Sequence, residues 1–85
     1  MIDVPDWFNK EKITSSLDAI PIVNGGGHPL DIVVKAVRQL EENQIYELIT
    51  PFLPVPLIDK VNAMGFESWT NQMNDDIYKT YFIKR

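Results

Sequence analysis

The residues best suited to chemistry lie in one short stretch, residues 24–31, which holds three of the chain's four glycines and its only histidine. A glycine-rich loop that leads into a helix leaves backbone N–H groups unpaired and directed at one point. A neutral imidazole beside that point could ligate a metal ion or a haem iron, or could act as an acid or a base. We therefore expect a ligand- or partner-binding site here, formed by Asn24, Gly25, Gly26, Gly27 and His28.

Asp31 lies three residues after His28 and could join it as a second metal ligand. A zinc site needs four protein ligands, or three and a water molecule. A metal ion or haem bound through His28 and Asp31 would therefore need further donors from a second subunit or from the cofactor. Two alternatives involve no metal: His28 could cap the helix or hydrogen-bond within the loop, and Asp31 could place negative charge favourably in the first helical turn.

The glycines carry no phosphate-binding signature, because no lysine follows them and the dinucleotide spacing is absent. The alternative is that a tight turn with positive φ requires them. A nucleophile–base pair would need Ser15, Ser16 or Thr50 beside His28, together with a third group to orient the base. Of these only Thr50 can be brought close by the expected topology, so we favour a binding protein over an enzyme.

Composition predicts one small domain of 85 residues, with 45% hydrophobic and 24% charged residues. A net charge of −4 and scattered basic residues argue against partners made of nucleic acid or acidic lipid. The lack of cysteine removes disulfide, thiolate and persulfide chemistry. Neither a signal peptide nor an apolar run long enough to span a membrane is recognisable, so we expect a cytoplasmic protein.

The elements should follow one another in the order β-α-β-α-β-β. The first helix should begin at Pro29 and end near Glu42-Asn43, and the second should begin near Val55 or Pro56 and end before Gly65. Strands are expected over residues 13–18, 44–50, 66–73 and 77–83. Two right-handed crossovers make the first three strands parallel, and the last strand is antiparallel. This order predicts a two-layer α/β sandwich, with a mixed four-stranded sheet and two helices on one face.

Ligands bind open α/β sheets at the carboxyl ends of parallel strands. The loops 24–28 and 50–54 both leave such ends, and their strands are expected to be neighbours. The second loop should therefore bring Phe52 and a rigid rim of prolines to face His28. Thr50 and Phe52 accordingly join the predicted site.

The second face of the sheet is left without a helix. Residues 1–12 form a polar lead-in whose Trp7 and Phe8 should pack back on the domain of residues 13–85. Tyr46, Trp69 and a row from the last strand are candidates for an apolar patch on this face. Such a patch would favour a homodimer or a protein partner.

Several motifs carry a resemblance to a known family: Leu17-Asp18, Gly26-Gly27-His28-Pro29-Leu30, Thr50-Pro51-Phe52-Leu53-Pro54-Val55-Pro56-Leu57 and Gly65-Phe66. Over residues 5–83 the chain resembles an uncharacterised bacterial domain family related to the TusA/SirA sulfur carriers. The resemblance implies a TusA/SirA-like fold. In the true carriers the sulfur-bearing residue is a cysteine directly before the first proline, where this chain has His28, and Asp31 replaces their second proline. Since imidazole cannot hold a persulfide, the resemblance implies the fold and the place of the site, but not sulfur transfer.

Three hypotheses follow from the sequence. The first is a small binding module that acts through His28 and the glycine-rich loop. The second is an enzyme or enzyme accessory in redox or sulfur metabolism, with His28 as acid, base, or metal or haem ligand. The third is a structural dimer built on the open face of the sheet.

Overall fold

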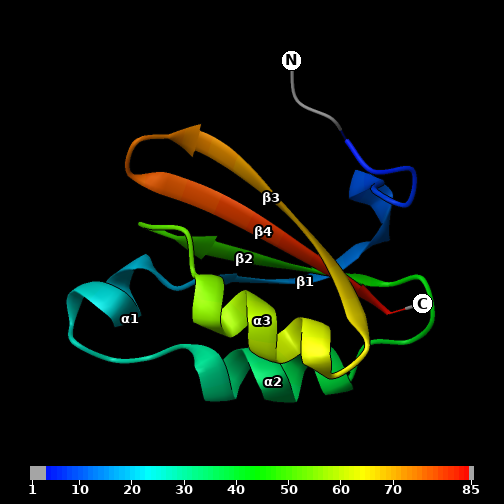
Figure 1. The fold of residues 1–85 in the computed structure, drawn as a ribbon, viewed down its shortest axis with the longest axis horizontal. Coiled ribbons are helices and arrows are strands. Elements are labelled where there is room, and N and C mark those ends of the chain that lie inside the picture. The colour runs from blue at the N-terminus through cyan, green and yellow to red at the C-terminus, as the bar shows by residue number, and fades with distance from the viewer. Residues whose placement is uncertain (1–3, 85) are drawn as a thin grey trace.

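Four strands form one mixed sheet in the order β1-β2-β4-β3 (Figure 1). The computed structural model describes residues 4–84. The strands are β1 (Ile13–Asp18), β2 (Ile45–Thr50), β3 (Phe66–Asn74) and β4 (Ile77–Lys84). β1 pairs parallel with β2, and β4 lies antiparallel between β2 and β3. β1, β2 and β3 therefore run in one direction, as predicted, and β2 is an interior strand.

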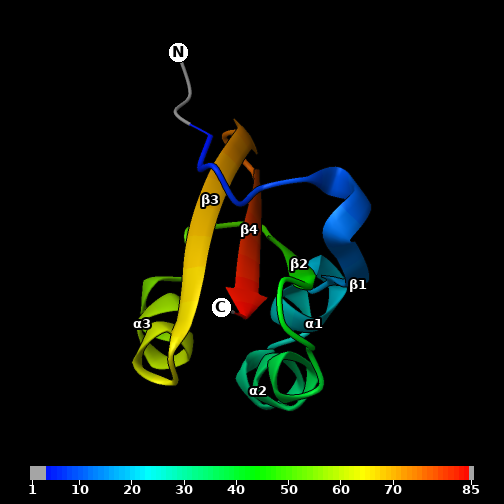
Figure 2. The same ribbon diagram turned by 90° about the vertical axis from the view of Figure 1, so that its right-hand side faces the viewer.

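Two helices cover one face of this sheet: α2 (Leu30–Arg38) and α3 (Val55–Ala63) (Figure 2). The sequence analysis predicted only these two helices, whereas the structure adds a third, α1 (Ile20–Asn24), directly after β1. Asp18 Oδ1 accepts a hydrogen bond from the Ile20 N–H at 3.1 Å, and Pro21 favours the first helical turn. A helix this short spans too few residues to show a 3.6-residue apolar period, so the sequence pattern did not predict it.

The end of α2 also differs from the prediction, which placed it near Asn43. The helix ends at Arg38, because a separate turn between Glu41 and Gln44 competes with further helix. In that turn the Glu41 N–H donates to Gln44 Oε1 at 2.8 Å, and the Gln44 N–H donates to the Glu41 carbonyl at 3.0 Å. Asn43 has a φ of 69° in this turn, and its N–H donates to the carbonyl of Lys84, the last residue of β4. The left-handed residue therefore directs the chain into β2 and does not cap the helix.

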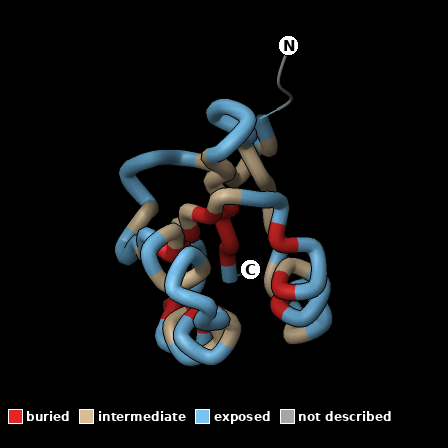
Figure 3. Tube along the Cα trace, turned by 90° about the vertical axis from the view of Figure 1, so that its left-hand side faces the viewer, coloured by how far each residue is buried: buried red, intermediate tan, exposed pale blue. Residues whose placement is uncertain are grey.

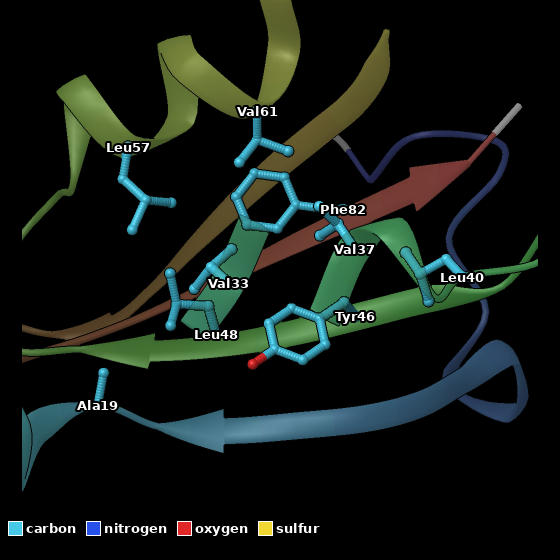
Figure 4. Packing of buried hydrophobic residues seen from close by; sticks show 9 residues of the cluster. All are labelled: Ala19, Val33, Val37, Leu40, Tyr46, Leu48, Leu57, Val61 and Phe82. Carbon is cyan, nitrogen blue, oxygen red and sulfur yellow. The ribbon is translucent and has the colours of Figure 1, made fainter. Parts of the chain in front are cut away.

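The main core lies between the helices and the sheet (Figure 4). Val33 and Val37 of α2 and Val61 of α3 are fully buried against strand residues. The cluster consists of Ala19, Val33, Val37, Leu40, Tyr46, Leu48, Leu57, Val61 and Phe82. Alternation explains the strand members Tyr46, Leu48 and Phe82, since every second side chain of a strand points to the helices.

The opposite face of the sheet is not bare. Residues of the lead-in cross it (Figure 2), and Phe8 makes edge contacts with Trp69 and Tyr81 at ring-centre distances of 4.9 and 4.7 Å. Trp7 packs on the same cluster, so the prediction that both rings fold back is confirmed. The prediction for Tyr46 was wrong: its ring lies on the helix side.

We expect Phe8→Ala to lower the free energy of unfolding by about 1–2 kcal/mol, because the half-buried ring loses two aromatic contacts. Urea unfolding followed by tryptophan fluorescence measures this change. Val4→Ala is the matched control, since Val4 is exposed in the same lead-in. Equal stability of the two variants would show that the lead-in is not part of the folded domain.

Candidate functional site

α2 and α3 begin side by side at the carboxyl ends of β1 and β2, the end of the molecule that faces the viewer in Figure 3. A cavity of about 250 Å³ lies between the two helix starts. The structure thus brings His28 and Phe52 together, as the pairing of β1 with β2 predicts. The cavity, here called the groove, is almost wholly apolar and is lined by His28, Pro29, Leu30, Phe52, Pro54, Pro56 and Leu57.

His28 is the one titratable side chain among these lining residues. Its imidazole is exposed, so it is not sealed among aliphatic neighbours. It does not cap α2, because the capping position is held by Pro29 and no side chain caps that helix. Within residues 4–84 the ring makes no hydrogen bond or ion pair. Both ring nitrogens are therefore available to a bound molecule.

The glycine loop does not present the unpaired amides that the sequence predicted. The N–H groups of Gly25, Gly26 and Gly27 donate to carbonyls of α1 at 2.9–3.0 Å. Gly26 has a φ of 86°, and a Cβ on Gly27 would lie 3.0 Å from Cγ2 of Ile22. The three glycines therefore close the end of α1, and they leave no amide cradle for an anion.

Three other predicted site residues lie outside the lining. Asn24 is the exposed last residue of α1. Thr50 is fully buried, and its hydroxyl donates to the Phe52 carbonyl at 2.6 Å. This bond fixes the turn that carries Phe52 to the groove, so Thr50 positions a lining residue. Asp31 lies exposed in the first turn of α2.

Metal binding through this chain alone would need more donors than the site offers. Among the described residues no group of three or more His, Cys, Asp or Glu side chains is placed to hold a metal ion. His28 and Asp31 could therefore bind a metal ion or a haem only with donors from another molecule.

Pro54 belongs to the proline rim that the sequence predicted, whereas Pro29, Leu30, Pro56 and Leu57 line the groove but were not predicted as site residues. Leu30 and Leu57 match the apolar periods of their helices, a pattern typical of core residues. Both lie in the first turn of a helix and pack in or against the main core cluster, so the groove borders that core. Their position could be found only by combining the helix starts with the pairing of β1 and β2.

A polar network lies on the other face of the sheet, away from the groove. Ser16 Oγ donates to Glu47 Oε1 at 2.8 Å. Burial, together with a hydrogen bond to Glu47 and its negative charge, raises the pKa of Tyr81 to about 12. Sequence reasoning missed this network because its members come from three strands. It anchors β1 and β4 to β2, beside the ring of Phe8.

Comparison of the chain with protein-family models, with curated proteins and with solved structures found no match. The resemblance to the sulfur carriers therefore depends on sequence motifs alone. None of the helices in the described part of the chain combines the length and apolar composition of a membrane span. The site has to be interpreted from its own geometry.

Gly26→Ala should lower the free energy of unfolding by about 1–2 kcal/mol, because an alanine at a φ of 86° is strained. His28→Ala should change it by less than about 0.5 kcal/mol, because an exposed ring without partners contributes little. Thermal unfolding of both variants measures the contrast. A His28→Ala variant as unstable as Gly26→Ala would show that the histidine is structural.

The network around Glu47 predicts a loss of stability in alkali. The unfolded chain releases the Tyr81 proton near pH 10, and the folded protein holds it until about pH 12. The contribution of Tyr81 is therefore complete below pH 10 and is lost between pH 10 and 12. Glu47→Gln should lower the pKa of Tyr81 but leave it above 10.0, because burial remains.

Tyrosinate absorbance during an alkaline titration reports this pKa, and Tyr81→Phe identifies the signal that belongs to Tyr81. If the titration of Glu47→Gln matched that of the wild type, the carboxylate would have no influence on the hydroxyl.

Proposed function

We propose that this chain is a binding module without enzymatic activity of its own, and that it takes an apolar group into the groove. His28 then donates or accepts a hydrogen bond at the mouth of the groove. The observation that carries the proposal is a cavity of about 250 Å³ with apolar walls and a single imidazole that has no partner within the described chain.

The lining favours binding over acid–base catalysis. A reaction of that kind needs a second titratable or nucleophilic group within hydrogen-bond reach of the first. The other described lining residues are prolines, leucines and Phe52, which carry no such group. Thr50 is the candidate nucleophile that the predicted topology placed nearest to His28, but its hydroxyl donates to the Phe52 carbonyl.

The groove is also suited to a rigid binding site. Pro29, Pro54 and Pro56 have restricted backbones, so little conformational entropy is lost when a ligand fills the space between them. The first-turn N–H groups of α2 and α3 are not capped by any side chain. At the start of α3 the Val55 N–H donates to the Leu53 carbonyl and Pro56 has no N–H, so the start of α2 is the one that favours a ligand with a hydrogen-bond acceptor next to its apolar part.

We further propose that the fold is of the TusA/SirA kind. The motifs of the sequence and the β-α-β-α-β-β order of the main elements support this assignment. In that case His28 stands where the carriers have their reactive cysteine, at the start of the first long helix. The chain would then keep the place of the carrier's site with a binding group in place of sulfur.

Titration of the isotope-labelled chain with N-acetyl-phenylalanine amide, followed by amide NMR shifts, tests the binding proposal. We expect the shifts to concentrate at residues 28–33 and 52–58. His28→Ala should weaken binding about fivefold, the loss of one hydrogen bond of about 1 kcal/mol. Phe52→Ala should weaken it by a similar factor or more, because it removes part of the apolar wall.

Asn62→Ala is the matched control, since Asn62 is exposed at the far end of α3. It should bind the amide like the wild type. Shifts centred on Trp69 instead, or unchanged affinity in both groove variants, would refute the proposal.

A further inference from the structure

Exposed apolar side chains extend the groove onto the surface. Phe52, Leu53 and Val55 are 46%, 47% and 48% exposed, and all three belong to the loop and helix start that form one wall of the groove. Large apolar side chains that gather on a surface mark an interaction site with another molecule. The occupant of the groove is therefore expected to cover this wall as well, which a single small molecule would leave open.

Acidic side chains flank the groove on both helices. Asp31 follows directly after the lining residues of α2, and Asp59 lies one turn beyond Pro56 on α3. Both are exposed, and neither forms an ion pair with another described residue. Lys35 and Lys60, the nearest basic residues on these helices, leave the two carboxylates unpaired.

Acidic residues outnumber basic ones at the groove end of the molecule. β1 and β3 end at this edge of the sheet, so Asp18, Asp75 and Asp76 lie there, together with Lys79, which pairs with Ile49. At the opposite edge, the basic residues Lys10, Lys12, Arg38 and Lys84 are balanced by nearby acidic residues such as Glu11, Glu41 and Glu42. The field at the groove end therefore attracts cationic molecules, although the groove itself is apolar.

We infer that the occupant is a basic segment of another protein, in which a bulky apolar side chain enters the groove and flanking Lys or Arg side chains meet Asp31 and Asp59. This inference rests on the proposed function, because it names the partner for the same groove. The apolar walls supply affinity, and the carboxylates select the charge of the partner.

Three synthetic peptides test the inference, each with one central phenylalanine. The residues on both sides of the phenylalanine are two lysines, two glutamines or two glutamates. We expect the lysine peptide to bind about fivefold more tightly than the glutamine peptide at low salt, and the difference to shrink as salt screens exposed charges. The glutamate peptide should bind most weakly.

The double variant Asp31→Asn, Asp59→Asn should remove most of the preference for lysine and leave the affinity of the glutamine peptide unchanged. The double variant Glu41→Gln, Glu42→Gln removes the same charge beyond the other end of α2, and it should keep the preference. Loss of the preference in this control alone would overturn the assignment of the carboxylates.

The outcomes separate the two proposals. Equal binding of the lysine and glutamine peptides, both weakened by Phe52→Ala, would refute the basic partner and support the binding groove. Binding of the lysine peptide that is unaffected by Phe52→Ala would refute both proposals.

Discussion

The parallel pairing of β1 with β2 is the constraint on which the rest of the molecule depends. Leu17 lies opposite Leu48 and Asp18 opposite Ile49, so the two strands end at the same level. The chain leaves both ends towards the same face, and the two long helices begin next to each other. A shift of this register would separate the two helix starts. The groove is thus a consequence of strand pairing, and the residues in its wall need no direct bond to one another.

The two faces of the sheet are stabilised by different kinds of contact. On the helix side, residues from strands and helices form a continuous apolar core. On the other side, a short lead-in supplies Phe8 and Trp7 to an aromatic cluster, and Glu47 ties hydroxyl groups of neighbouring strands together. A domain this small has little core to spare. The lead-in therefore covers surface that would otherwise favour self-association, and the hypothesis of a dimer through this face loses its apolar patch.

The sequence was informative wherever a residue acts through its own backbone preference or through regular alternation. Gly65 has the positive φ expected after a helix, and the strands lie within a residue or so of their predicted bounds.

The sequence was misleading where two local structural preferences compete. The glycine loop was interpreted as an open cradle because α1 was too short to detect, and the carbonyls of that helix use the amides. The helix α2 was predicted too long because the turn of Glu41 and Gln44 depends on a side-chain hydrogen bond. The insertion of β4 between β2 and β3 depends on pairing between distant residues, which no local pattern specifies.

The contrast between Thr50 and His28 decides how the site should be interpreted. Both were candidates for chemistry: Thr50 is the last residue of β2, and His28 lies just before α2 at the same edge of the sheet. Thr50 is buried and uses its hydroxyl to hold the Phe52 turn, so its polar group stabilises the protein's own structure. His28 is exposed and uses neither nitrogen within the described chain, so it contributes little to the fold. An imidazole without a partner in the described chain, at the mouth of an apolar groove with rigid prolines, supports the proposal that His28 binds a molecule from outside.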